Sequence, residues 1–183
     1  MENQLTTTLY LTGEESDLRN ARILLAGMPI GDDGNIKLRD LAEILNLNVR
    51  YEGHIVGDEL RFRADYIGFD TETPNQPPLE ILDALCRKFP SLKYFYLVQL
   101  ADKNITNDRE QKFFILPKIR VDLFHKDQEL YCESDTYDEA LAWLSEQLHQ
   151  HFHTEEDVNL FLDAQRDGET LNFCRVTRTQ IVD

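Results

Sequence analysis

The stretch from Ala64 to Leu100, ADYIGFDTETPNQPPLEILDALCRKFPSLKYFYLVQL, predicts a strand, a helix and a second strand joined by short connections. Its first part has the pattern of an extended strand that runs into a proline-rich turn. Pro77 and Pro78 suit the first turn of a helix, and apolar residues then recur at helical spacing. The helix should end at Phe89, because the residue before a proline disfavours helical geometry. The aromatic and β-branched segment that follows predicts a strand buried on at least one face.

The run FDTETPNQPPLEILDALCRKFPSL in this stretch resembles the motif of the YubB-like family, a ferredoxin-like domain family of plasmid and phage open reading frames. In that motif a strand ends in a Phe-x-Thr step, paired prolines follow, and a helix ends in Phe-Pro-x-Leu. The matching positions are Phe69, Thr71, Pro77, Pro78, Leu82, Phe89, Pro90 and Leu92, whereas the Trp usual before the prolines is replaced by residues 73–76. The resemblance implies a ferredoxin-like fold. The family has no established activity, so it implies no functional residue.

Hydrophobic patterns and turn residues predict elements on both sides of this unit. Before it we expect a strand over 5–11, a helix from a capping box at Thr12 and Glu15 to about Ala26, a helix over 37–45, and a hairpin of strands 49–56 and 59–69 around Gly57-Asp58. After it we expect a polar loop over 101–111, strands over 112–116, 119–124, 129–132 and 171–182, and two helices that begin at Thr136 and Thr154, the second ending near Arg166 before a turn at Asp167-Gly168.

These elements predict an α+β fold, in which a ferredoxin-like antiparallel sheet with helices on one face is extended by a β region and two C-terminal helices. The 183 residues suffice for one sizeable core, so we expect a single domain over 1–183, with the ferredoxin-like core in 1–101 and the extension in 102–183.

Composition favours a cytoplasmic protein. The chain has no apolar run near the length of a membrane span, and no basic region precedes the first apolar residues, so we expect neither a signal peptide nor an anchor. Three cysteines, Cys86, Cys132 and Cys174, lie far apart among apolar or strand-like neighbours. Reduced, buried thiols explain this pattern best.

Charge is the most informative property of the sequence. The chain holds 34 Asp and Glu against 19 Lys and Arg, and residues 122–169 alone hold 14 acidic residues and two basic ones. Such an excess argues against direct nucleic-acid binding, which requires basic residues that contact phosphates. It favours a basic protein partner, whose encounter the field would accelerate, and the alternative is that the charge only keeps the protein soluble.

Three groups of residues invite a chemical interpretation. His149, His151 and His153 could form a metal site if they shared a helix face, but their spacing matches no established zinc motif and suits an ordinary helix end. Asp70 and Glu72 lie at a strand end, where surface or capping roles are expected rather than acid–base chemistry. The aromatic residues Tyr94, Phe95, Tyr96, Phe113 and Phe114 could stack nucleic-acid bases, but the acidic chain favours core packing.

We therefore expect a non-enzymatic binding protein that inhibits a basic partner, most simply an immunity protein that neutralises a nuclease-type toxin by mimicking nucleic-acid charge. The residues expected to bind the partner are Asp135, Tyr137, Asp138, Glu139, Trp143, Glu146, Glu155, Glu156, Asp157 and Asp163, with Tyr131 a further possible aromatic anchor. No cofactor or metal is expected, and the protein should be a monomer or a weak homodimer.

Three other functions remain open at this point. One is a plain accessory domain or a homodimer, with the strand edges of the β region as the interface. A phage or plasmid inhibitor of a host defence protein would use the same acidic surface. A metal-dependent hydrolase would instead use the histidine cluster, with His149 and His153 as ligands and an acid of the run 155–157 to complete the shell.

Overall fold

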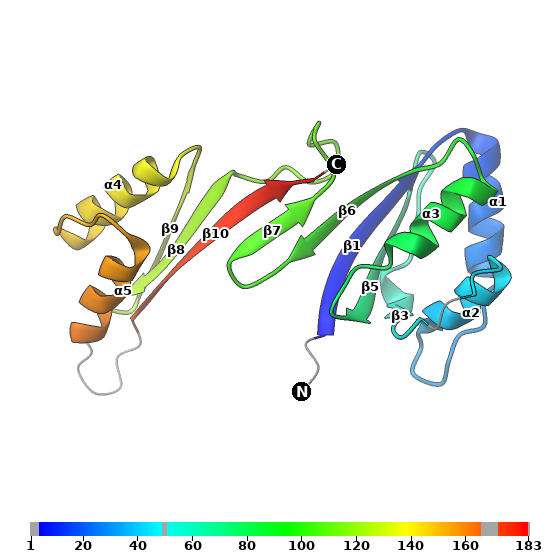
Figure 1. Cartoon of the computed structure of the whole chain (residues 1–183), viewed down its shortest axis with the longest axis horizontal. Helices are drawn as coiled ribbons and strands as arrows, with labels where there is room; N and C mark the ends of the chain where they lie inside the picture. The colour runs from blue at the N-terminus through cyan, green and yellow to red at the C-terminus, as the bar shows by residue number, and fades with distance from the viewer. Residues whose placement is uncertain (1–3, 49–50, 166–171, 183) are drawn as a thin grey trace. The chain divides into compact units, whose positions relative to one another are not determined.

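The computed structural model describes residues 4–48, 51–165 and 172–182, which form a mixed α+β fold of ten strands and five α helices (Figure 1). The chain divides into two compact units. The first unit consists of Met1–Gln99 and Thr106–Phe113, and the second of Leu100–Ile105 and Phe114–Asp183. The expectation of one domain with a core over 1–101 stays a prediction, since compactness alone does not show which parts fold independently.

The first unit is built around an antiparallel sheet with β1 (Gln4–Thr12) at its centre. On one side β1 pairs with β5 (Ile67–Pro74), which in turn pairs with β3 (His54–Ile55) and β4 (Arg61–Phe62), and β3 pairs with β2 (Ile36–Lys37). On the other side β1 pairs with β6 (Lys93–Gln99).

Three helices cover one face of this sheet: α1 (Glu15–Ala26), α2 (Leu38–Ile44) and α3 (Leu79–Lys88) (Figure 1). The strand pairing places Leu9 opposite Phe69 and Leu11 opposite Ile67, and all four side chains are buried. Because side chains alternate along a strand, this face forms the core and the other face carries Tyr10 and Asp70. The strand, helix and strand expected over 64–100 are confirmed as β5, α3 and β6, whereas the narrower ferredoxin-like assignment stays a prediction.

The expected hairpin around Gly57-Asp58 is wrong. Gly57–Glu59 forms a 3₁₀ turn, and β3 and β4 each pair with β5 instead of with one another. The glycine permits a long-range contact, because a Cβ at Gly57 would clash with the carbonyl oxygen of Gly34. Its N–H also donates to the side-chain oxygen of Asn35, at 3.2 Å.

Two other local predictions are also wrong. Thr12 does not cap a helix, because β1 continues through it. The N-cap residue of α1 is Glu14, and its side chain makes no capping hydrogen bond. The strand expected over 112–116 is absent from the described residues, and a strand forms earlier, as β7 (Lys103–Thr106) within the expected loop. The cause lies in Asp108, whose carboxylate accepts the backbone N–H groups of residues 112 and 113 and turns the chain there.

The second unit places β8 (Ile119–His125) between β9 (Gln128–Ser134) and β10 (Phe173–Ile181), with both pairings antiparallel. Helices α4 (Tyr137–Leu148) and α5 (Glu155–Ala164) lie on one face of these strands (Figure 1). The core between helices and strands consists of Ile119, Val121, Leu123, Ala140, Leu141, Leu144, Leu148, Phe152, Val158, Leu162, Cys174 and Val176. The predicted strands over 119–124 and 129–132 and both C-terminal helices are therefore confirmed within the described residues. Residues 49–50, the helix end at Arg166, the turn at Asp167-Gly168 and the strand start at Leu171 lie outside them.

Both helices of the second unit begin with the capping boxes expected from the sequence. The Thr136 hydroxyl accepts the N–H of Glu139, whose carboxylate accepts the N–H of Thr136 in return. Thr154 and Asp157 make the same reciprocal pair at the start of α5. These contacts satisfy backbone donors that a helix start otherwise leaves without partners.

Replacing Thr136 by Ala should lower the free energy of unfolding by about 1 kcal/mol, because the cap of α4 is lost while the packing of the helix is not touched. Urea denaturation followed by circular dichroism measures the change. Thr136→Ser keeps the hydroxyl and should cost much less, so equal losses in the two variants would contradict the capping role.

Candidate functional site

The outer side of α5 forms a shallow groove of about 510 Å³ in the second unit, which we call the α5 groove. It is lined by Tyr137, Thr154, Glu155, Glu156, Asn159, Leu160, Asp163 and Arg178. Residues 156, 160 and 163 follow one another at helical spacing, so two carboxylates flank one apolar side chain. Leu160 is 62% exposed, so the groove offers apolar surface between the two acids.

The rim of the α5 groove is fixed by contacts of Tyr137, Glu155 and Arg178. The Tyr137 hydroxyl accepts the backbone N–H of Glu155 at 2.8 Å, which ties the starts of α4 and α5 together. The Arg178 guanidinium lies 5.1 Å above the Tyr137 ring and its Nη2 is 3.5 Å from a carboxylate oxygen of Glu155. Tyr137 and Glu155 thus interact with residues of the same unit, and their main role is to hold the rim of the groove in place.

Two other expected binding residues act at helix ends. Glu139 and Asp157 complete the capping boxes described above. The hydrogen bond from the Thr154 side chain lowers the pKa of Asp157, with a further contribution from the His153 backbone N–H. Both carboxylates are exposed, but each accepts a backbone N–H at the start of its own helix, so their main role is to stabilise the helix starts.

The remaining expected residues belong to α4 and the turn before it. Asp135 pairs with Lys118 at 3.3 Å, and Trp143 is half-buried against the core of the unit. Asp138 and Glu146 are exposed, and no described residue forms an ion pair with either one. Neither of them lines the α5 groove.

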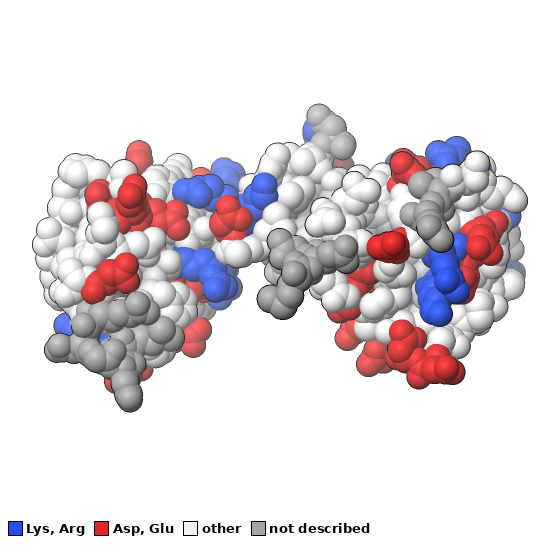
Figure 2. Space-filling model, turned by 60° about the horizontal axis from the view of Figure 1, so that its bottom comes forward, with Lys and Arg blue, Asp and Glu red and all other residues white. Residues whose placement is uncertain are grey.

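Cations from the strands interrupt the acidic surface that the sequence suggested. Arg120 of β8 lies 2.9 Å from Asp122 and 3.9 Å from Glu133, and Arg178 of β10 reaches Glu155. Figure 2 shows Lys and Arg side chains next to Asp and Glu side chains on the drawn face of the second unit. The acids of residues 122–169 therefore do not form an unbroken acidic face. Arg120 and Arg178 lie outside this range in the sequence, on β8 and β10, but the fold places them next to its acids.

The histidines do not share a helix face. Helix α4 ends at Leu148, and His149 has a left-handed backbone with φ of 53°. The rings of His151 and His153 pack edge to face with their centroids 4.7 Å apart, in the connection before α5. Across the ranges 4–48, 51–165 and 172–182, no group of three or more His, Cys, Asp or Glu side chains is placed to hold a metal ion.

The acids on the helix-free face of the first sheet have partners of their own. Arg61 lies 3.6 Å from Asp70 and 3.0 Å from Glu59. Glu72 accepts a hydrogen bond from Gln4 at 2.7 Å and lies 3.3 Å from His54. Asp70 and Glu72 are thus half-buried, and each lies within ion-pair distance of a basic side chain, Arg61 or His54.

An aromatic cluster covers part of the same face. The Phe113 ring stacks on Tyr10 at 4.5 Å and lies 5.2 Å from Phe95, while Tyr66 packs edge-on against Tyr10. Asn107 holds the same segment to β6, because its side chain bonds the backbone of residues 94 and 96. These rings pack on one another on the face opposite the core, and Phe95 and Phe113 are half-buried there, so the core packing expected for these two residues is wrong.

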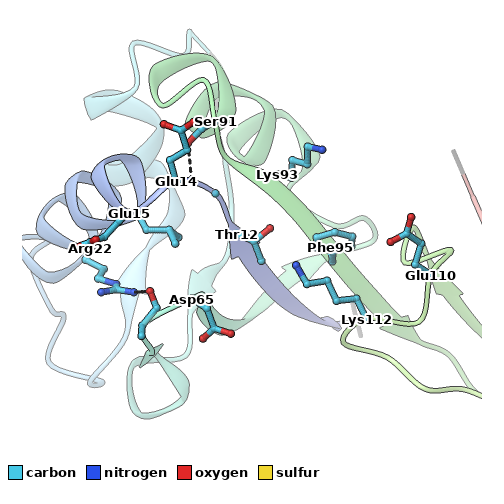
Figure 3. A pocket seen from close by; sticks show the side chains of 13 residues that line it. Thr12, Glu14, Glu15, Arg22, Asp65, Ser91, Lys93, Phe95, Glu110 and Lys112 are labelled. Carbon is cyan, nitrogen blue, oxygen red and sulfur yellow. Dashed lines mark hydrogen bonds between the residues drawn. The ribbon is translucent and has the colours of Figure 1, made fainter.

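A cleft of about 1050 Å³ lies in the first unit between the start of α1, the start of β6 and the segment 106–113 (Figure 3). Its charged lining is mixed, with Arg22, Lys93 and Lys112 against Glu14, Glu15, Asp65 and Glu110. Arg22 is committed to structure, since its guanidinium donates to the carbonyl oxygens of residues 63 and 64. Sequence reasoning missed this cleft, because its residues come from several separate segments.

The cysteines give no sign of reactivity. Burial raises the pKa of the Cys174 thiol to about 12, and burial also raises the pKa values of Cys86 and Cys132. Only a thiolate attacks electrophiles readily, so burial keeps these side chains in the unreactive form at neutral pH.

Cys174 should therefore react very slowly with iodoacetamide at pH 8 in the folded protein, and rapidly once the protein is denatured, when its pKa returns to the ordinary range. Mass spectrometry of peptides after timed alkylation measures the two rates. Similar rates in the folded and denatured states would contradict the burial of this thiol.

Comparison of the chain with models of protein families, with curated proteins and with solved structures finds no match in any of the three. In the part of the chain that the structure describes, none of the helices has the length and apolar character needed to cross a bilayer.

Proposed function

We propose that this chain is a non-enzymatic acidic binding protein that inhibits a basic protein partner, with a nuclease-type toxin as the first candidate and an immunity protein as the corresponding role. The observation that carries the proposal is the arrangement of Glu156, Leu160 and Asp163 along the α5 groove. Two carboxylates on one helix face complement a surface rich in Lys and Arg, and the exposed leucine between them would add apolar contact to such an interface.

Rigidity of α5 supports this role. Val158 and Leu162 are buried in the core of the unit, the capping box fixes the start of the helix, and Tyr137 holds the adjoining backbone. A preorganised surface loses little conformational entropy on binding. The two carboxylates would occupy positions that nucleic-acid phosphates take on the partner, while Leu160 fills an apolar pocket between them.

The expected binding residues then divide by role. Glu156 and Asp163, with Leu160 added, would make the contacts of the interface. Asp138 and Glu146 would contribute to long-range attraction, which speeds association without a large effect on the bound state. Asp135, Tyr137, Glu139, Trp143, Glu155 and Asp157 would act through the structure of the unit.

The test uses a panel of basic nuclease toxin domains, each co-expressed with this protein in bacteria and assayed for growth and, in purified form, for binding at several salt concentrations. We expect at least one domain to be neutralised, with binding that weakens at least tenfold between about 50 and 200 mM salt. The double variant Glu156→Lys and Asp163→Lys should abolish rescue.

The matched control is Asp32→Lys with Glu43→Lys, which changes the net charge equally at exposed sites of the first unit. It should leave rescue intact. Binding that does not respond to salt, or equal loss in the two double variants, would show that the α5 groove is not the interface. Protection from a host defence protein instead of a toxin would assign the anti-defence role to the same surface.

A further inference from the structure

Strand β9 ends the sheet of the second unit. It pairs with β8 over seven residues, from Gln128 opposite His125 to Ser134 opposite Ile119, and the register contains no bulge. No strand among the described residues pairs with its other edge. β9 also lacks Pro and Lys, two residues that commonly protect an open edge from further pairing.

The turn before β9 determines which backbone groups point outward. Lys126 and Asp127 both have positive φ, of 49° and 59°, as in a two-residue hairpin of the primed type. In such a hairpin the residues beside the turn, here His125 and Gln128, form a hydrogen-bonded pair, and bonded and non-bonded pairs then alternate. The N–H and C=O groups of residues 129, 131 and 133 therefore point away from β8.

The same three residues carry their side chains on the face opposite to α4 and α5. Leu130 and Cys132 pack against the core, so the alternation of a strand places Glu129, Tyr131 and Glu133 on the other face. Tyr131 is 64% exposed, and Arg120 lies 5.2 Å from the centre of its ring. The free edge thus presents an acidic, an aromatic and an acidic side chain in register with three outward backbone positions.

From this juxtaposition we propose that β9 binds an extended segment of a basic protein as an additional antiparallel strand. The segment would place Lys or Arg opposite Glu129 and Glu133 and an apolar or aromatic residue opposite Tyr131. Backbone hydrogen bonds would supply affinity, and the cross-strand charge pairs would select the segment. The proposal names a second interaction surface and does not depend on the α5 groove.

Charge also argues against a second copy of this chain as the occupant. Antiparallel pairing of two β9 strands about Tyr131 would place Glu129 of each copy opposite Glu133 of the other. Like charges directly opposite are destabilising in a sheet, so charge favours pairing of β9 with a basic strand and disfavours pairing with β9 of a second copy.

The experiment uses a macrocyclic hairpin peptide whose free strand reads Thr-Lys-Val-Phe-Val-Lys-Thr, titrated into the full chain. We expect saturable binding by calorimetry and at least tenfold slower amide hydrogen exchange at Glu129, Tyr131 and Glu133, with residues 128, 130 and 132 changed less. The same peptide with Glu in place of both Lys should bind at least tenfold more weakly. The variant Glu129→Lys with Glu133→Lys should reverse this preference.

Two controls separate the possible explanations. Methylation of the Phe amide of the peptide removes one interstrand hydrogen bond but no charge, and it should abolish binding. The variant Glu156→Lys with Asp163→Lys should bind the peptide as the original chain does, so failure of the α5 groove would not be mistaken for failure of the β9 edge. Absence of binding, binding without protection of the three amides, or tolerance of the methylated peptide would overturn the proposal, as would a stable homodimer paired through β9.

Discussion

Replacement of Leu144 by Ala is expected to lower the free energy of unfolding by about 3 kcal/mol. The Leu144 side chain is completely buried in the core of the second unit, on the helix α4 that packs against the strands β8 and β9. Truncation removes three carbon atoms from contact and leaves a cavity that rigid strands on one side cannot close. Urea denaturation monitored by tryptophan fluorescence measures the loss, because Trp143 packs against the same core.

The matched control is Leu160→Ala, the same chemical change on an exposed helix position of the same unit. Leu160 is 62% exposed, so its truncation should change the stability by less than about 0.5 kcal/mol. Because Leu160 is also the apolar centre of the α5 groove, Leu160→Ala should weaken partner binding. Leu144→Ala should not weaken it when equal amounts of folded protein are compared. A loss under about 1 kcal/mol for Leu144→Ala would contradict the packing described for this core.

The second large effect is expected at Asp108, where substitution by Ala should cost about 3 kcal/mol of stability. The side chain is 1% exposed and its two carboxylate oxygens accept the N–H groups of Lys112 and Phe113, at 3.0 and 2.6 Å. Without the acceptor, two backbone donors lose their partners, and the turn that places Phe113 on Tyr10 is weakened. Thermal unfolding followed by near-ultraviolet circular dichroism reports both the stability and the aromatic packing.

Glu110→Ala serves as the control for Asp108→Ala. Glu110 is an exposed acid of the same segment, so its removal changes the net charge equally and should leave both signals nearly unchanged. Asp108→Asn keeps one acceptor oxygen and should fall between the two. If Asp108→Ala retained the near-ultraviolet signal and the stability of the control, the carboxylate would not hold the turn.

Local signals in the sequence predicted local structure well. Paired prolines, a helical apolar period and Phe89-Pro90 delimit α3 with few alternatives, and the two capping boxes locate the starts of α4 and α5. The failures arise where a distant residue decides the outcome. Gly57-Asp58 resembles a hairpin turn in sequence, but the glycine is needed because the backbone of Gly34 approaches it closely. The aromatic segment after residue 111 does not form a strand, because the Asp108 carboxylate accepts the backbone N–H of Phe113 and turns the chain there.

The acidic character of the site was predictable, but its layout was not. Residues at spacing of four and three along α5 could be placed on one face from the sequence alone. Which acids remain available depends on cations that β8 and β10 bring from other parts of the chain, namely Arg120 and Arg178. The role of Tyr137 as a support of the helix ends, through the N–H of Glu155, likewise follows only from three-dimensional proximity.

The path of the chain between the two units limits how the protein can be dissected. Residues 100–105 belong to the second unit, yet 106–113 return to the first, where Asn107 bonds β6 and Phe113 stacks on Tyr10. A fragment that stopped at Gln99 would uncover these aromatic rings, and one that continued to Phe113 would take a piece of the second unit with it. No single peptide-bond cleavage leaves both halves complete, so a protease that nicks this region should weaken two folded parts at once.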